Sequence, residues 1–280
     1  MNARIFSGAR RVDGIAADDR GLAYGDGLFE TLRAHRGGLP WWDAHWARLA
    51  RGAGRLGMTL PDPDLVRREA GDLLAGTDAG VVKLIVTRGG GGRGYSPARI
   101  SEPTWALSLH PLPAAAANGL ALRWCDTRLS IQPTLAGIKH CNRLEQVLAR
   151  AEWNDPGAAG RDADEGLMLD GEGCVVSATA ANLFLWAEGR WTTPRIDRCG
   201  VAGICRAWLL SELRAEEVRL TRPEVESAEA VFLCNAVRGI LPVARLGDRA
   251  WAPHPQVSAL RARLAAAAPM FAEPHRGSHA

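Results

Sequence analysis

The order of apolar and polar residues predicts a chain of mixed strands and helices. Apolar and polar residues alternate over residues 28–33, and residues 81–87 are rich in β-branched side chains, so both segments predict strands. Aspartates open the segments 43–56 and 64–74, where they are favourable N-caps, and these segments predict helices. The mixture favours an α/β fold with α+β character.

The second half of the chain predicts a strand-rich domain with a few helices. Strand-like segments are separated by turns that contain glycine and aspartate. The expected strands cover residues 120–124, 165–170, 175–186, 190–194, 231–235 and 238–246. The expected helices cover residues 144–153, 206–213 and 225–230.

Residues 111–119 are uncharged and rich in proline and alanine, which favours a linker near the middle of the chain. We therefore expect a smaller N-terminal α/β domain over residues 1–112, a linker at 113–119 and a larger C-terminal domain over 120–280. The tail is expected to fray from about residue 269.

Lysine is scarce in this chain, and its two positions therefore become candidates for amine chemistry. Among 34 basic residues, Lys83 and Lys139 are the two lysines and the other 32 are arginines. Arginine stays protonated, whereas a buried lysine can act as a nucleophile or carry a proton. We expect Lys139 at a junction between a strand and a helix, and we expect Lys83 to be an edge or snorkelling lysine of a strand.

The helix after Lys139 is predicted from the spacing of Leu144, Val147, Leu148 and Ala151, which repeats at i, i+3, i+4 and i+7. An ordinary surface lysine is the alternative interpretation of Lys139.

Two glycine-containing segments suggest binding sites. Residues 88–95 hold four consecutive glycines followed by Arg93 and Tyr95, and one of the two tyrosines of the chain lies here. Arg93 suits a carboxylate because its guanidinium can bind two oxygens at once. Residues 199–206 form a turn that leads into a helix, where backbone N–H groups and the helix dipole favour a phosphate.

The overall composition excludes several classes of protein. The net charge is +3 without a basic block, so nucleic acid is not an expected partner. No apolar run is long enough for a membrane helix, and the first residues do not resemble a signal peptide. Six scattered cysteines without a CxxC pair argue against a zinc site and disulfides, and they favour a cytoplasmic location.

A reactive lysine, a phosphate-binding turn and a carboxylate-binding arginine fit one cofactor, pyridoxal 5′-phosphate (PLP). PLP offers an aldehyde to the amine and a phosphate to the turn, where Gly203, Ile204 and Cys205 would bind it. Patterns for dinucleotide binding, phosphate-binding loops, metalloproteases and serine hydrolases are missing from the sequence.

The sequence also resembles a known family, the fold-type IV PLP enzymes, which include class IV aminotransferases and aminodeoxychorismate lyases. The resemblance spans about residues 1–250 and its motifs occur in the family's order: 20–33, Arg48 in AHWARL, Lys139 in IKHCNRLE, TAANLF ending at Phe184, GVAGICR at 200–206 and CNAVRGILPV from Cys234. The segments 88–96 and 140–153 resemble the lyase branch most.

The resemblance implies a two-domain homodimer with PLP between the domains and Lys139 as its Schiff-base lysine. The implied activity belongs to folate biosynthesis and converts 4-amino-4-deoxychorismate to 4-aminobenzoate and pyruvate. The implied cofactor-binding residues are Arg48, Lys139, Ser177, Asn182, Gly203, Ile204, Cys205, Asn235 and Ala236. Tyr24, Glu30, Arg93 and Tyr95 are expected near the substrate.

Ser177 departs from the family pattern, which has a glutamate five residues before the asparagine of TAANLF. A serine can form a hydrogen bond with the pyridine nitrogen but does not keep it protonated. This favours a lyase, with two alternatives: an aminotransferase of the same fold, or a PLP-binding protein without turnover.

Overall fold

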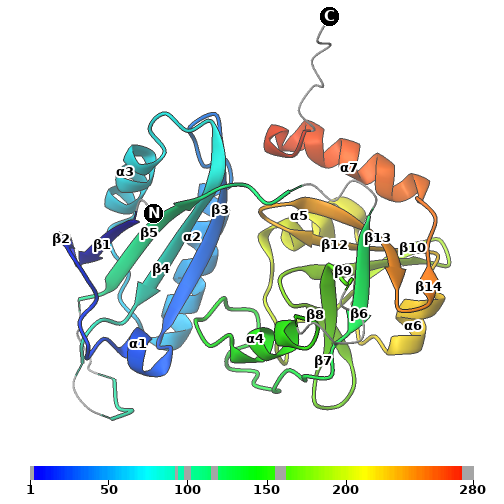
Figure 1. Cartoon of the computed structure of the whole chain (residues 1–280), viewed down its shortest axis with the longest axis horizontal. Helices are drawn as coiled ribbons and strands as arrows, with labels where there is room; N and C mark the ends of the chain where they lie inside the picture. The colour runs from blue at the N-terminus through cyan, green and yellow to red at the C-terminus, as the bar shows by residue number, and fades with distance from the viewer. Residues whose placement is uncertain (1–2, 92–93, 98–101, 115–118, 155–161, 273–280) are drawn as a thin grey trace, which may run out of the picture.

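The computed structural model describes residues 3–91, 94–97, 102–114, 119–154 and 162–272. Its strands form two separate sheets, one built before residue 111 and one after residue 119 (Figure 1). The observed elements therefore change sheet across the segment expected to be a linker, of which residues 115–118 lie outside the described part. The domain limits themselves stay a prediction.

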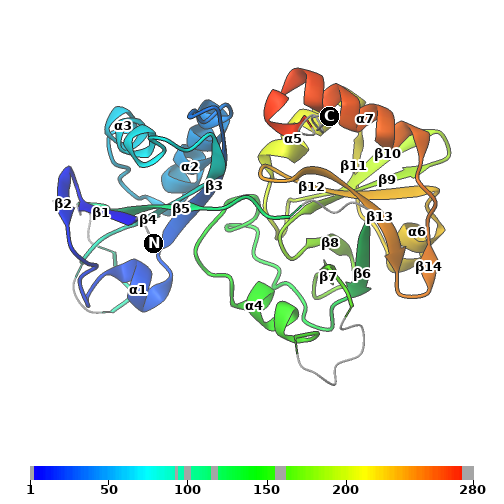
Figure 2. The same ribbon diagram turned by 45° about the horizontal axis from the view of Figure 1, so that its top comes forward.

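The first sheet has five antiparallel strands in the order β2-β1-β5-β4-β3. Its strands are β1 (Ala3–Ser7), β2 (Arg10–Val12), β3 (Gly27–His35), β4 (Ala79–Thr87) and β5 (Thr104–His110). Three helices accompany it: α1 (Arg20–Tyr24), α2 (Trp42–Leu56) and α3 (Pro63–Leu73). Figure 2 shows α2 and α3 over the same face of the sheet.

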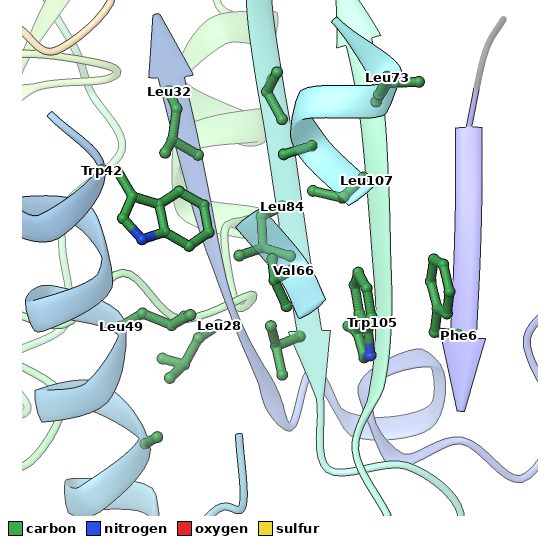
Figure 3. Packing of buried hydrophobic residues seen from close by; sticks show 14 of the residues in the cluster. Phe6, Leu28, Leu32, Trp42, Leu49, Val66, Leu73, Leu84, Trp105 and Leu107 are labelled. Carbon is green, nitrogen blue, oxygen red and sulfur yellow. The ribbon is translucent and has the colours of Figure 1, made fainter. Parts of the chain in front are cut away.

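The covered face of this sheet forms the N-terminal core. Side chains of β3 and β4 such as Leu28, Leu32 and Leu84 are buried against Leu49 of α2 and Val66 of α3 (Figure 3). Burial of each large apolar side chain contributes about 1.5–3 kcal/mol. The burial of β3 alternates along the strand, so its odd-numbered residues from 29 to 35 lie on the face opposite α2 and α3.

The second sheet is mixed and larger, with the order β11-β10-β9-β12-β13-β6-β7-β8, and β14 pairs with β13. Its strands are β6 (Leu120–Trp124), β7 (Glu165–Leu169), β8 (Val175–Ala178), β9 (Asn182–Ala187), β10 (Arg190–Pro194), β11 (Glu216–Val218), β12 (Ala230–Asn235), β13 (Gly239–Leu246) and β14 (Arg249–Ala250). The accompanying helices are α4 (Leu144–Ala151), α5 (Ile204–Leu213), α6 (Arg222–Ser227) and α7 (Pro255–Ala267), followed by the 3₁₀ helix η1 (Pro269–Phe271).

The end of the chain corrects the expectation of a tail that frays from about residue 269. Pro269–Phe271 forms η1, and Met270 is only 2% exposed in the core that α5 and α7 share. The aromatic ring of Phe271 contacts Trp41 and the guanidinium of Arg33. These contacts anchor the segment on the N-terminal half; residues 273–280 lie outside the described part.

The apolar stripe after Lys139 forms the predicted helix, but it does not face the core. α4 ends at Ala151, and Leu144, Val147 and Leu148 are 76%, 59% and 60% exposed. Helical spacing therefore indicated the helix correctly without telling whether the chain itself covers its apolar side.

Candidate active site

Lys139 lies in the loop between β6 and α4, beside the start of β3. The backbone N–H of Phe29 donates to the carbonyl of Lys139 at 3.0 Å, and that of Cys141 donates to Gly27 at 2.8 Å. These bonds attach residues 139–141 to β3 as a short additional strand. The expected strand-to-helix junction is therefore wrong, because no regular strand directly precedes Lys139 and α4 begins five residues later.

Gly137 attaches the same loop to the C-terminal half. Its N–H donates to Gly200 at 2.9 Å, and its carbonyl accepts from Ala202 at 3.1 Å. Gly137 has a φ of +82°, which a residue with a side chain rarely adopts. The loop is thus fixed between β3 and the turn before α5, and it holds Lys139 between them.

The amine of Lys139 is suited to work without a proton. Burial, together with the positive charge of Arg48, lowers the pKa of Lys139 to about 7. Glu30 acts in the opposite direction, whereas Arg143 and Lys83 add to the decrease. A large fraction of such an amine is neutral near pH 7 and can act as a nucleophile or a base.

The second lysine faces the same space, and of its two expected positions, an edge or a snorkelling lysine of a strand, the structure excludes the edge. Lys83 is in β4, which pairs with β3 on one side and β5 on the other. Its Nζ lies 5.6 Å from the centre of the Phe29 ring, and the Nζ of Lys139 lies 4.1 Å from the same centre. The face of the first sheet opposite α2 and α3 therefore presents a second amine beside Lys139.

Arg48 is held by a buried network on α2 and β3. Its Nε donates to Glu30 Oε1 at 2.8 Å, and its Nη2 also binds this carboxylate. His45 Nδ1 contacts Glu30 Oε2 at 2.6 Å. Burial acts to raise the pKa of Glu30, but the bonds from Arg48 and His45 outweigh it and keep that pKa below its usual value. Glu30 is therefore an ionised acceptor.

Arg48 also reaches across to the other half of the molecule. Its Nη1 donates to the carbonyl of Ala202 at 3.1 Å, directly before the first turn of α5. The structure thus brings Arg48 to the turn where the sequence predicts a phosphate. It places Glu30, predicted near the substrate, in a fully buried position where its carboxylate holds Arg48 and His45.

The first turn of α5 has the form of an anion site. Gly203 is its N-cap, and no side chain caps the free N–H groups that follow at Ile204 and Cys205. A Cβ at position 203 would lie 2.2 Å from Oδ1 of Asn182, so this close approach requires glycine. Asn182 Nδ2 donates to Val201 at 2.9 Å and fixes the turn.

Ser177 and the segment 235–236 lie on strands of the second sheet or at their ends. Ser177 is in β8, is 9% exposed, and its hydroxyl has no hydrogen-bond partner within the described residues. The side chain of Asn235 is used by its own turn, because Oδ1 accepts from Val237 and Arg238 and Nδ2 donates to Ala180. Only the backbone of this turn and Ala236 remain available to a ligand.

The two tyrosines predicted near the substrate come together. The rings of Tyr24 and Tyr95 are 5.5 Å apart, and Arg20 donates to the carbonyls of Gly94 and Tyr95 at 2.8 and 3.0 Å. Asn142, beyond Lys139, donates to Gly25 at 3.1 Å and keeps this region near the loop. Arg93 lies outside the described residues.

Two charged or polar residues of this site, His45 and Arg143, were not predicted from the sequence, and Lys83 was expected only as a strand lysine. The fold brings all three close to Lys139 or Arg48. The spacing of His45 and Arg48, three residues apart on a helix, indicated a shared face. The scarcity of lysine also indicated Lys83, but nothing in the local sequence told which face of β4 it would occupy.

A lysine amine of lowered pKa and an uncapped helix end, joined through one loop, are features typical of an enzyme. The chain belongs to the class IV aminotransferase family, because the family model described as Amino-transferase class IV matches residues 27–246.

Known proteins of this family include both lyases and aminotransferases. Aminodeoxychorismate lyase of Vibrio harveyi is 35% identical over 238 residues, which cover 82% of this chain and 86% of that protein. The crystal structure of 4-amino-4-deoxychorismate lyase from Pseudomonas aeruginosa has a TM-score of 0.84 and 42% identity, covering 94% of this chain and 98% of that one. D-alanine aminotransferase of Bacillus licheniformis is 25% identical over 263 residues, covering 87% and 86%.

Two further features of the described residues bear on the class of protein. Their helices include none that is long and apolar enough to cross a membrane. Their histidine, cysteine and acidic side chains form no group of three or more that could hold a metal ion.

Proposed function

We propose that this enzyme is an aminodeoxychorismate lyase that uses PLP to convert 4-amino-4-deoxychorismate to 4-aminobenzoate and pyruvate. The observation that carries the proposal is the buried amine of Lys139, with its lowered pKa, held between β3 and the uncapped first turn of α5. The similarity to lyases over most of the chain supports this substrate.

The chain's own residues fit the cofactor. The N–H groups at Gly203, Ile204 and Cys205 would bind its phosphate, and Arg48 would add a positive charge beside them. Ser177 and Asn182 would lie along its ring, with Ala236 and the backbone of Asn235 near its substrate side. When bound, PLP withdraws electrons from the carbon that carries the substrate amine.

Lys139 would move the proton in this reaction. Its neutral Nζ would remove the proton from C4 of the bound substrate ring. The C3–O bond then breaks, the ring becomes aromatic, and enolpyruvate leaves. Lys139 returns the proton to the methylene carbon of the enol, which gives pyruvate, so that atoms and electrons balance without an oxidant.

The remaining predicted residues would recognise the substrate. Tyr24 and Tyr95, whose rings form one aromatic pair, would lie near the substrate, and Arg93 would bind a substrate carboxylate. Glu30 would influence the substrate only indirectly, by holding Arg48 in place. Its carboxylate is already occupied by the hydrogen bonds from Arg48 and His45.

We also propose a cytoplasmic homodimer. The exposed apolar face of α4, formed by Leu144, Val147 and Leu148, is the kind of surface that another subunit covers. Six free cysteines fit a reducing compartment. Sedimentation of a Val147→Asp, Leu148→Asp double variant should yield a monomer, and an unchanged dimer would show that this face is not the interface.

One assay tests the function. The purified enzyme with PLP is given 4-amino-4-deoxychorismate, and 4-aminobenzoate is followed by its fluorescence and pyruvate by a coupled reaction. Equal amounts of both products support the lyase. Product formation only with an amino acid and a keto acid would identify an aminotransferase instead, and the chain's own departure at Ser177 makes that outcome unexpected.

A further inference from the structure

Both ends of the glycine-containing segment 88–95 are attached to the start of α1. At the first end, the backbone N–H of Arg20 donates to the carbonyl of Gly89 at 3.0 Å. At the other end, the Nη1 and Nη2 atoms of Arg20 donate to the carbonyls of Gly94 and Tyr95 at 2.8 and 3.0 Å. One arginine therefore contacts the segment where it leaves β4 and again where it returns.

The guanidinium of Arg20 is buried and held by an acidic partner. Arg20 is 3% exposed, and its Nε donates to Asp26 Oδ2 at 2.9 Å. The same carboxylate accepts from Nε and Nη2 of Arg88 at 2.7 and 3.2 Å. Burial acts to raise the pKa of Asp26, but the bonds from Arg88 and Arg20 outweigh it and lower that pKa. An ionised Asp26 thus holds Arg20 in one orientation.

The same network reaches the end of α2. Arg88 donates through Nη1 to the carbonyl of Gly57 at 2.7 Å and through Nη2 to that of Leu56 at 2.8 Å. Every part of the network therefore rests on a regular element of the N-terminal half, which makes Arg20 a fixed point for the segment that it contacts.

Tyr95 depends on these bonds because its side chain is scarcely covered. Tyr95 is 86% exposed, and its ring lies 5.5 Å from that of Tyr24. The guanidinium of Arg20 lies 5.0 Å from the centre of the Tyr24 ring. Glycine-rich backbone has more conformational freedom than other backbone, so ordering this segment requires such contacts. Arg20 therefore contacts both members of the tyrosine pair, one through its ring and one through its carbonyl.

The helix α1 is in turn attached to the segment that follows Lys139. Gly25, the C-cap of α1, has a φ of +67°, and its carbonyl accepts from Asn142 Nδ2 at 3.1 Å. A Cβ at position 25 would lie 2.6 Å from Asn142 Oδ1, so this contact requires glycine. A continuous series of contacts thus connects Tyr95, through Arg20 and α1, to the loop that carries Lys139.

We propose that Arg20 is a positioning residue that fixes Tyr95 beside Tyr24 and thereby prepares the tyrosine pair for the ring of the substrate. The inference deepens the proposed function and rests on it, because that function places both tyrosines near the substrate. Aromatic side chains offer a large apolar surface to a ring. A side chain that is already ordered loses less entropy when the substrate binds, so Arg20 acts on substrate affinity rather than on bond breaking.

The experiment compares Arg20→Gln and Arg20→Lys with Arg4→Gln, the matched control. Arg4 belongs to the same sheet, and its Nη1 pairs with Glu69 of α3 at 2.6 Å. For each PLP-loaded variant, KM and kcat for 4-amino-4-deoxychorismate and the dissociation constant of PLP are measured. The rate at which chymotrypsin cleaves after Tyr95 is measured without substrate, because cleavage requires a segment that can leave its folded conformation.

Arg20→Gln should raise KM about tenfold and speed the cleavage after Tyr95 by about fivefold or more, since two charge-assisted hydrogen bonds are lost. The kcat and the dissociation constant of PLP should stay within about twofold of the wild-type values, because Arg20 acts on substrate binding alone. A role in stability alone would reduce the amount of folded enzyme and leave KM unchanged. Arg20→Lys should give intermediate values, because an ammonium group cannot replace the planar fork.

A double variant shows whether Arg20 acts through Tyr95. In a Tyr95→Ala background, Arg20→Gln should raise KM by less than about twofold, because the group that it positions is already absent. An equal rise in both backgrounds would overturn the inference.

The inference is also overturned if Arg20→Gln changes either KM or the cleavage rate by no more than Arg4→Gln does. If Arg20→Gln does not fold, Arg20→Lys decides by the same criteria. If the wild-type enzyme does not convert 4-amino-4-deoxychorismate, the proposed function fails. The cleavage rate needs no turnover and still decides on Arg20: faster cleavage supports its positioning of Tyr95, and unchanged cleavage overturns it.

Discussion

Two arginines, the buried Arg48 and the half-buried Arg143, act on the charge of Lys139, and they differ in how their own charge is compensated. Arg48, on α2, has a carboxylate, an imidazole and a carbonyl around it, and Glu30 neutralises it. Arg143, before α4, has one backbone bond, a buried unpaired Nη2 and no acidic partner among the described residues. A buried charge with a partner can stabilise the fold. A buried charge without one costs free energy until another group, such as a ligand, pairs with it.

Mutations around Arg48 and mutations at Arg143 should therefore have different consequences. Changes around Arg48 should reduce stability and cofactor binding together, since this network joins α2 to the turn before α5. Changes at Arg143 should reduce ligand binding, while the free energy of unfolding hardly falls. Both arginines lower the pKa of Lys139, so the lysine is the point at which the two regions act together.

The largest effect is expected at the lysine itself. Lys139→Ala removes both the bond to the cofactor and the group that moves the proton, so lyase activity should fall by at least about 10⁴-fold. Spectra of the variant with PLP should lack the absorption band of the wild-type enzyme. Lys83→Ala is the matched control and should keep that band. If the Lys83→Ala variant lost the band although Lys139 is intact, the assignment of Lys139 as the cofactor-binding lysine would be contradicted.

The second-largest effect is expected at Arg48, the arginine whose charge Glu30 neutralises. Glu30→Ala leaves Arg48 buried without its carboxylate and should reduce the free energy of unfolding by about 3–5 kcal/mol. Chemical denaturation of the PLP-free protein measures this value. Arg143→Gln should change it by less than about 1 kcal/mol, and equal losses for the two variants would remove the contrast between the regions.

A pH-dependent effect follows from Lys139. Its pKa is about 7 in the folded chain, mainly because of burial, and 10.5 is its ordinary value. Between these two values the unfolded chain binds more protons, so the free energy of unfolding should rise with pH in this window and stay flat below it. The rise should amount to roughly 2–4 kcal/mol.

Denaturation of the PLP-free wild type and of Lys139→Met across pH 6 to 10 isolates this contribution, because all other groups are common to both. The difference between the two proteins should shrink as pH rises. A constant difference would mean that Lys139 is protonated in both states throughout the range.

The smallest effect is expected at Ser177. A single neutral hydrogen bond contributes about 1 kcal/mol, so Ser177→Ala should lower kcat by about fivefold. A Ser177→Thr variant, which keeps a hydroxyl, serves as the control and should lose less. A loss of more than 100-fold in Ser177→Ala would show that the hydroxyl does more than contact the ring.

Much of the fold could be predicted from the sequence, and the predictions that failed share one cause. Strands β6 and β10 were placed at their observed ends because turn residues bound them on both sides. The helix α7 was not predicted, because its alanine-rich sequence shows no clear apolar stripe. Local patterns also did not tell that Lys83 lies on an inner strand or that the apolar face of α4 is exposed, since burial depends on distant segments.

The same limit applies to the site. The scarcity of lysine and the order of the family's motifs identified Lys139. The turn that opens α5 was recognisable from its glycines. The roles of His45 and Arg143 were not, because they depend on which groups lie opposite them in the fold. Glu30 lies close to Lys139 as expected, but the direction of its carboxylate could be seen only in three dimensions.

The chain has just two lysines, and both face the ring of Phe29. Reduction of the PLP-loaded enzyme with borohydride, followed by peptide mass spectrometry, shows which amine carries the cofactor. We predict that the pyridoxyl group is on the peptide that contains Lys139 and absent from the peptide that contains Lys83. A label on Lys83, or on neither lysine, would contradict the proposed active site.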